Sequence, residues 1–280
     1  MSAVGRLIDS HFHLWRLEPS DATGILSDPR LKDSITWGDY AAARGELSLA
    51  GAVAVEVVGG DAELALFEAA AAGHGELKAI VAHAPLEEDG VAADLDRLLR
   101  HPLVRGVRRN TQREADPLFC GREGFIAGAR AVGERGLVCD ICVKDYQLDG
   151  AIALARGAPN TTIVLNHLGK PTIGGDLSVW REKMAVLADC ANVHLKLSVV
   201  VHGVPDERWD EETVAPVVAE VLARFGAERM LWASNWPVAP LVTDYGDWFA
   251  LAQRLTGSLG AEARARIFHG NAAALYRIEA

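Results

Sequence analysis

The sequence lacks the features that mark several classes of protein. It has 28 Lys and Arg against 38 Asp and Glu, a formal net charge of −10, and no block of like charges. A basic surface that attracts nucleic acid or anionic lipid is therefore missing, so we expect neither a nucleic-acid nor a membrane partner. No run approaches the roughly 18 apolar residues of a membrane span. The N-terminus also lacks a basic stretch followed by an apolar segment, so we expect a cytoplasmic protein.

Cysteine is also scarce. Four cysteines in a chain of 280 residues are too few for a disulfide framework. Cys139 and Cys142 have the C-x-x-C spacing. They fall in a predicted strand, however, where residues three apart face opposite sides, whereas the redox motif belongs at the start of a helix. We therefore expect neither a redox nor a zinc site at this pair.

What the sequence does contain is an alternation of short apolar, β-branched segments with longer stretches of helical pattern. The predicted strands span residues 7–13, 52–58, 78–85, 104–110, 137–144, 161–167, 193–200 and 230–237. The predicted helices span residues 37–49, 61–73, 90–100, 121–135, 147–157, 177–191, 211–225, 244–255 and 261–276.

This alternation requires parallel strands, because each crossover helix returns the chain to the same end of the sheet. Eight such units predict an α/β fold, a (β/α)8 TIM barrel. An open doubly wound sheet is the alternative, but no G-x-G-x-x-G turn follows the first strand. Because no repeat or Pro/Ser-rich linker divides the chain, we expect residues 1–280 to form a single domain.

Polar residues collect at the predicted carboxyl ends of the strands, where the active site of a parallel barrel forms. In chain order they are His11, His13, Glu56, His83, Arg108, Arg109, Asn110, Cys142, Lys144, Asn166, His167, Lys196, Ser198, Ser234 and Asn235. Alternation along a strand predicts which of them share a face. Arg108, rather than Arg109, is expected in the lumen because it alternates with Gly106.

The same alternation predicts which residues share a face in three other strands. If His11 and His13 face the lumen, Asp9 is expected there too. His167 is grouped with Ile163 and Leu165 on one face of its strand. Asn235 is grouped in the same way with Leu231 and Ala233.

Six short motifs occur in order between residues 8 and 276, namely "IDSHFHLW", "RGVRRN", "NHLGKP", "KLS", "ASNWPV" and "GNAAALY". Together they resemble the amidohydrolase superfamily, and within it the amidohydrolase-2 type of TIM-barrel hydrolases. That group includes sugar lactonases and the 2-pyrone-4,6-dicarboxylate lactonase. H-x-H alone is a weak signal, whereas the ordered set of six is a strong one.

The resemblance implies a catalytic group of His11, His13, His167 and Asn235 around the reacting carbonyl. In metal-using relatives the histidines help to hold a divalent ion. We therefore expect His11, His13 and His167 as the ligands of one metal ion, with zinc preferred. The pyrone lactonase resembles this site and works without a metal, so a metal-independent site is the open alternative.

Asn235 stands where the hydrolytic relatives have a carboxylate that takes the proton from the attacking water. A neutral amide cannot accept that proton. Hydrolysis would then need another base, for which His83, Glu56 or a metal-bound hydroxide are the candidates. Without such a base, a substrate hydroxyl would attack the lactone carbonyl, and the enzyme would be an isomerase.

Arg108 is the predicted clamp for a substrate carboxylate or lactone carbonyl, because a guanidinium offers a planar fork of donors. An ion pair with Glu56 is its structural alternative. The further substrate-binding candidates are Lys144, His83, Glu56 and Trp236, with the loop residue His202 as an additional contributor.

The sequence therefore predicts a hydrolase that opens a lactone of a sugar acid or of a dicarboxylate. A lactone isomerase is the first alternative, and a catalytically weakened barrel that acts as a binding protein is the second. The expected partner is a small lactone or carboxylate. The sequence does not specify which lactone is used, and it is compatible with a homo-oligomer.

Overall fold

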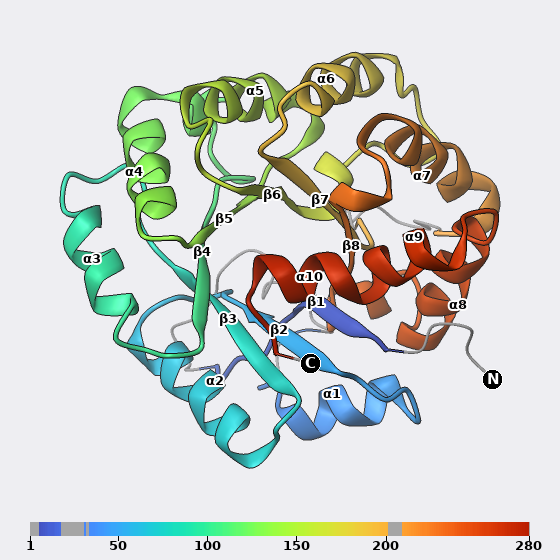
Figure 1. Ribbon diagram of the computed structural model, residues 1–280, viewed down its shortest axis with the longest axis horizontal. Coiled ribbons are helices and arrows are strands. Elements are labelled where there is room, and N and C mark those ends of the chain that lie inside the picture. Colours follow the sequence, from blue (N-terminus) through green and yellow to red (C-terminus); the bar gives the residue numbers. More distant parts are fainter. Residues whose placement is uncertain (1–5, 18–30, 32–33, 201–208, 280) are drawn as a thin grey trace.

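The computed structural model describes residues 6–17, 31, 34–200 and 209–279. Within them one parallel eight-stranded sheet runs in the order β1 to β8 (Figure 1). The strands are β1 (Ile8–Phe12), β2 (Gly51–Val55), β3 (Leu77–His83), β4 (Val104–Asn110), β5 (Val138–Cys142), β6 (Ile163–Leu165), β7 (Val193–Leu197) and β8 (Met230–Trp232). Beyond β8, Trp236 bridges Phe12 of β1 in parallel, and the Asn235 N–H donates to the His11 carbonyl at 2.9 Å. These contacts nearly close the barrel, which confirms the predicted fold.

A ring of helices surrounds the strands (Figure 1). They are α1 (Trp37–Arg44), α2 (Asp61–Gly73), α3 (Val91–Leu98), α4 (Glu123–Glu134), α5 (Leu148–Gly157), α6 (Ser178–Ala188), α7 (Glu211–Phe225), α8 (Tyr245–Leu255), α9 (Ala261–Ala265) and α10 (Asn271–Leu275). The last predicted helix, 261–276, is thus α9 and α10 joined by a π-helical turn over Arg266–Gly270. Among the described helices, none is both long and apolar enough to cross a bilayer.

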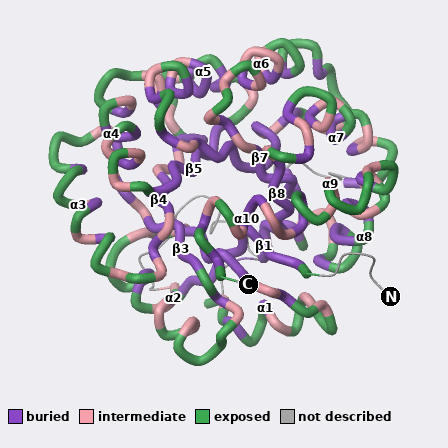
Figure 2. The backbone as a smooth tube through the Cα atoms, in the orientation of Figure 1, coloured by how far each residue is buried: buried purple, intermediate pink, exposed green. Residues whose placement is uncertain are grey.

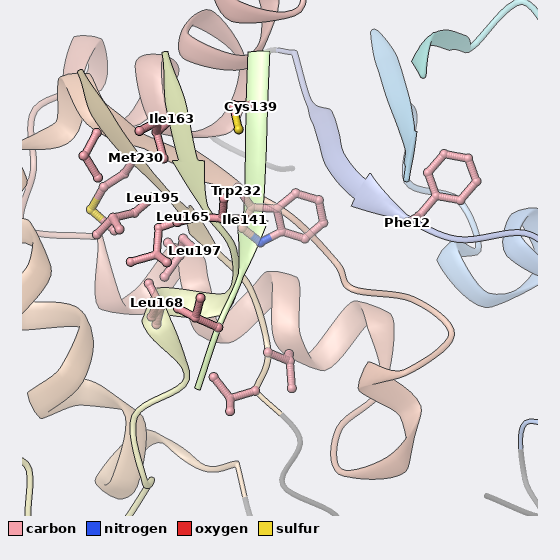
Figure 3. Close-up of a cluster of buried hydrophobic side chains, with 14 of the residues drawn as sticks. Phe12, Cys139, Ile141, Ile163, Leu165, Leu168, Leu195, Leu197, Met230 and Trp232 are labelled. Carbon is pink, nitrogen blue, oxygen red and sulfur yellow. The ribbon is translucent and has the colours of Figure 1, made fainter. Parts of the chain in front are cut away.

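The apolar core has two layers, and Figure 2 shows the buried residues gathered around the strands, inside the helices. The outer layer packs the strands against the helices; Figure 3 shows part of it, including Cys139 of β5. The inner layer fills the floor of the lumen with side chains of the strands and of the C-terminal segment. Its members are Ile8, Val53, Val55, Ala79, Val81, Val138, Val164, Leu231, Ala272, Tyr276 and Ile278. Strands buried on both faces explain why they appear as nearly continuous apolar runs.

The predicted phase of β6 is wrong. Ile163 and Leu165 lie in the outer layer (Figure 3), whereas Val164 faces the floor of the lumen. Alternation therefore brings Asn166, and not Ile163 or Leu165, to the lumen side of this strand. His167 enters the lumen for a different reason, a left-handed backbone conformation described below.

The prediction that Asp9 shares the lumen with His11 is also wrong. The Asp9 carboxylate accepts hydrogen bonds from Tyr40 of α1 at 2.9 Å and from Tyr245 of α8 at 3.2 Å, so it faces the helices. The register of β1 shifts between Asp9 and Phe12, so the alternation does not continue from His11 back to Asp9. Asp9 instead helps to close the barrel.

The turn after β2 is held by a single buried carboxylate. Glu63 of α2 accepts hydrogen bonds from the backbone N–H groups of Val57, Val58 and Gly59 at 2.8 to 3.0 Å. Burial, reinforced by the charge of Glu56, raises the pKa of Glu63 from 4.5 to about 7. The folded protein therefore binds a proton at Glu63 more tightly than the unfolded chain does.

This shift predicts a pH dependence of stability with a definite sign. When the pKa of an acid is higher in the folded protein than in the unfolded chain, the free energy of unfolding falls as the pH rises between these two pKa values. The ionisation of Glu63 should lower the free energy of unfolding by about 3 kcal/mol between pH 4.5 and 7. The variant Glu63→Gln should lack this part of the pH dependence. Urea unfolding curves across that range, with the exposed Glu123→Gln as matched control, measure this difference. A Glu63→Gln variant that keeps the wild-type slope would contradict the assignment.

Candidate active site

The predicted catalytic residues meet in the lumen, above the apolar floor. His11, His13, Arg108, His167 and Asn235 are all buried, with exposed fractions of 4% or less. They come from β1, from β4 and from the segments that follow β6 and β8. One polar cluster is thus built from segments that lie more than 200 residues apart in the sequence.

Left-handed backbone conformations place two of these residues. His167 has φ 53° and Asn235 has φ 56°. Such values are uncommon outside glycine, cost conformational energy, and are better tolerated by Asn and His than by most residues. β6 and β8 end earlier than predicted, at Leu165 and Trp232, and the left-handed backbone at His167 lets this residue enter the lumen.

The three imidazoles lie against one another. The Nε2 atoms of His11 and His13 are 3.0 Å apart, and the ring centroids of His11 and His167 are 4.8 Å apart. His167 Nδ1 lies 2.8 Å from Ser198 Oγ. The cluster thus presents several ring nitrogens within one small, buried volume.

The surroundings of all three rings favour the neutral imidazole. Burial is the main cause that lowers their pKa values, and neighbouring cations add to it: Lys196 for His11, Arg108 for His13 and Lys170 for His167. The pKa of His13 falls from 6.5 to about 3. Each ring therefore carries one N–H and one lone pair.

Two independent contacts fix where the proton of His11 lies. The His13 Nδ1 is 2.7 Å from the Val55 carbonyl, which can only accept, so His13 is protonated on Nδ1 and its Nε2 must accept from His11 Nε2. On the opposite side, the Lys196 Nζ lies 3.3 Å from His11 Nδ1 and can only donate. Both contacts favour a proton on Nε2 of His11. The longer contact of Arg108 Nη1 with the same nitrogen, at 3.5 Å, comes from a group that can only donate and opposes it.

Arg108 is held in place by its neighbours. Its Nε donates to Glu56 Oε1 at 2.7 Å, its Nη2 donates to the Glu56 carbonyl, and its Nη1 donates to Asn166 Oδ1 at 3.3 Å. The guanidinium has five N–H donors, so these contacts take one from each nitrogen. The Nη1 also lies 3.5 Å from His11 Nε2, so within the described part of the chain it is Nη2 that keeps an N–H for an incoming oxygen. Arg108 thus lies in the lumen, as predicted, and it also forms the ion pair with Glu56 that was its structural alternative.

Beneath the histidines lies an ion pair that sequence reasoning did not identify. Lys196 of β7 and Asp140 of β5 are fully buried and in direct contact. Asp140 also accepts from Tyr276 Oη at 2.8 Å and from Asn166 Nδ2 at 3.0 Å. The signal was present, because Asp140 is a lone acid in the otherwise apolar β5 segment "VCDIC".

The other predicted site residues have different positions. Glu56 is buried in its pair with Arg108, and its Oε2 lies 4.0 Å from Nδ1 of the partly exposed His83. Trp236 packs against Tyr40, at 5.5 Å between ring centroids, within the outer core. Lys144 is exposed beside Tyr146 and does not join the cluster. His202 lies outside the described residues.

Asn235 uses its amide in two contacts. Its Nδ2 donates to the Val199 carbonyl at 3.0 Å, and its side chain also hydrogen-bonds His13. The first contact needs an N–H, which a carboxylate at this position could not supply. An amide therefore suits this position.

The contacts of His11 do not suit a divalent ion held between the histidines. An imidazole binds a metal through a lone pair, but His11 has its proton on Nε2, and the Lys196 ammonium faces its lone pair. Arg108 adds a second positive charge, 3.5 Å from His11 Nε2. Among residues whose placement is described, no three His, Cys, Asp or Glu side chains group as a metal site. The predicted zinc ligands therefore do not fit the ion in this arrangement.

Comparison with known proteins agrees with the fold and with the motif order. The amidohydrolase family model matches residues 8–278. An L-fucono-1,5-lactonase of Burkholderia ambifaria is 35% identical, covering 72% of this chain and 71% of its own. An L-fucono-1,5-lactonase of Burkholderia multivorans is 28% identical over 97% of this chain and 96% of its own.

A solved structure of an amidohydrolase from Burkholderia multivorans with bound zinc superimposes with a TM-score of 0.87. It is 25% identical and covers 98% of this chain and all of its own. Members of the superfamily are typically metal-dependent, so the unfavourable metal geometry here is a difference in detail within a shared fold. The chain is therefore an enzyme of the amidohydrolase family.

Proposed function

We propose that this protein hydrolyses a lactone of a sugar acid. The observation that carries the proposal is the position of Arg108, whose guanidinium lies in a buried lumen beside the imidazoles and keeps an N–H on Nη2. Donors fixed in a site that excludes water stabilise the negative charge that develops on a carbonyl oxygen during acyl transfer. The lactonase names of the relatives support a cyclic ester as the substrate.

In this mechanism the lactone carbonyl oxygen accepts hydrogen bonds from Arg108 and from His11 Nε2–H. Water attacks the carbonyl carbon while a base takes one of its protons, and that proton passes to the ring oxygen as the ring C–O bond breaks. The products are a hydroxyl and a carboxylic acid, which releases its proton to solvent as a carboxylate. The charge on the oxygen is greatest in the transition state, so these donors act mainly on kcat. No step requires a metal ion.

The base that activates water is the second part of the proposal. Asn235 cannot take a proton, and both the charge and one oxygen of Glu56 are engaged by Arg108. His83 pairs in register with Arg108 across β3 and β4, so the two side chains lie on the same side of the sheet. We assign the role of base to His83, with the second Glu56 oxygen, 4.0 Å away, to stabilise the imidazolium that forms.

One observation favours isomerisation as a second candidate. The eighth-strand position carries an amide that is committed to the Val199 carbonyl, so no carboxylate base is present there. A substrate hydroxyl placed near His83 would compete with water for the same carbonyl and would give a lactone of another ring size.

The direct test is a substrate panel of L-fucono-1,5-lactone, L-rhamnono-1,4-lactone and further sugar-acid lactones. A pH indicator follows acid release and NMR follows ring size, with heat-denatured protein as the control for spontaneous opening. We expect stoichiometric acid release. Ring-size change without acid would establish the isomerase, and no turnover across the panel would favour a binding protein.

Adjacent arginines provide a matched pair of variants. Arg108→Lys loses the planar fork and should lower kcat/KM by about 10²- to 10³-fold. Arg109 pairs with Glu87 and Glu114 outside the lumen, at 2.8 and 2.7 Å, so Arg109→Lys should leave the rate within a few fold. Steady-state kinetics on the best lactone measures both variants. Equal losses in the two would refute the role of Arg108.

A further inference from the structure

Lys196 is a buried cation that the proposed reaction does not use directly. Its exposed fraction is 0%, and it lies between Asp140 below and His11 above. The Tyr276 ring, from the end of the C-terminal helix, lies under its ammonium with the centroid 5.5 Å away. Among the described residues of the cluster, Lys196 therefore contacts His11 directly and reaches Arg108 through Asp140 and Asn166.

An ion pair at this depth needs an explanation other than stability. Removing two charges from water is costly, and well-packed apolar residues in place of a buried pair are often neutral or stabilising. The floor directly below is already apolar, with Val164 and Leu231 among its members. An apolar replacement would therefore match its surroundings, which indicates that the charge acts on a neighbouring group.

That neighbour is His11, because the Lys196 ammonium can only donate to its Nδ1. In the free protein, His13 imposes the same proton position on His11 from the other side. A substrate oxygen that accepts from His11 Nε2 displaces the contact with His13. Lys196, 3.3 Å from Nδ1, then remains as the contact that favours a proton on Nε2, against Arg108 Nη1, which lies 3.5 Å from Nε2 and can only donate.

We propose that Lys196, anchored by Asp140 and Tyr276, is a positioning residue that keeps His11 protonated on Nε2. His11 is thereby a hydrogen-bond donor toward the lactone carbonyl and is prevented from offering that nitrogen to a metal ion. The part that names the carbonyl rests on the proposed function. The proton position and the exclusion of a metal do not depend on it.

The anchoring groups explain how a flexible side chain is held. Asp140 accepts from Lys196, Tyr276 and Asn166, so its two oxygens are fixed from three directions. Asn166 in turn accepts from Arg108 Nη1. The two cations of the site, Lys196 and Arg108, are thus oriented by one hydrogen-bonded network. Burial lowers the pKa of Lys196, but the contact with Asp140 opposes this and favours the ammonium form.

Nitrogen-15 NMR of the histidine side chains tests the proton position directly. Long-range proton–nitrogen spectra distinguish a protonated from an unprotonated ring nitrogen, and His11→Gln identifies the signals. We expect wild-type His11 to be protonated on Nε2 and unprotonated on Nδ1. A proton on Nδ1 would overturn the proposal, whatever the lactone panel gives.

Zinc binding tests the second consequence. Lys196→Met alone leaves Asp140 buried without its cation, so the double variant Lys196→Met/Asp140→Asn is used, with Lys183→Met as the matched control. Lys183 forms an ion pair with Asp149 at 2.9 Å, and neither residue belongs to the hydrogen-bonded network of the lumen described above. The double variant should bind Zn²⁺ about 10- to 100-fold more tightly than wild type, with shifts in the His11 and His13 signals. Affinity equal to that of wild type would overturn the proposal.

The two proposals fail separately. Loss of lactone turnover in the double variant, with KM nearly unchanged and kcat lowered about 10²-fold, is the expected kinetic result. If wild type turns over no lactone while His11 stays protonated on Nε2 and the zinc result holds, the proposed function is overturned and the role of Lys196 stands.

Discussion

The buried ion pair between Lys196 and Asp140 is the interaction on which the rest of the site depends. It joins β5 to β7 in the middle of the barrel, and through Tyr276 it connects the C-terminal helix to the lumen. Breaking one partner of such a pair costs about 3–5 kcal/mol, because the other charge is left buried and unpaired. The apolar floor below and the histidine cluster above therefore share one electrostatic centre.

That centre changes the chemistry available to the H-x-H motif. A divalent ion between His11 and His13 would need a lone pair on Nε2 of both rings, whereas Lys196 and the Val55 carbonyl together put a proton on one of those two atoms. With Asn235 in place of a carboxylate, the site has less negative charge to offer a metal ion. In the proposed reaction, Arg108 and the His11 N–H that Lys196 maintains stabilise the oxyanion.

Much of this arrangement could be predicted from the sequence, because strand alternation and helix pattern are properties of local composition. The eight strands were found in order, and the alternation with Gly106 correctly placed Arg108 rather than Arg109 in the lumen. Buried strands have apolar residues on both faces, however, so their phase is weakly marked. This explains the wrong phase of Ile163 and Leu165 in β6.

Other features depended on backbone and tertiary geometry that composition does not reveal. The left-handed conformations of His167 and Asn235 lie beyond strands that end earlier than predicted, and they redirect these side chains. The register shift in β1 turns Asp9 toward Tyr40 and Tyr245. Tyr276 reaches Asp140 across 136 residues of sequence, a contact that no local pattern predicts.

In the proposed reaction, water attacks the carbonyl carbon of a lactone in this lumen. Turnover of L-fucono-1,5-lactone in H₂¹⁸O, with mass spectrometry of the product and a protein-free control, tests it most directly. We expect one ¹⁸O atom in the carboxylate of the acid formed. Label on the released hydroxyl, or a rearranged lactone without label, would contradict it.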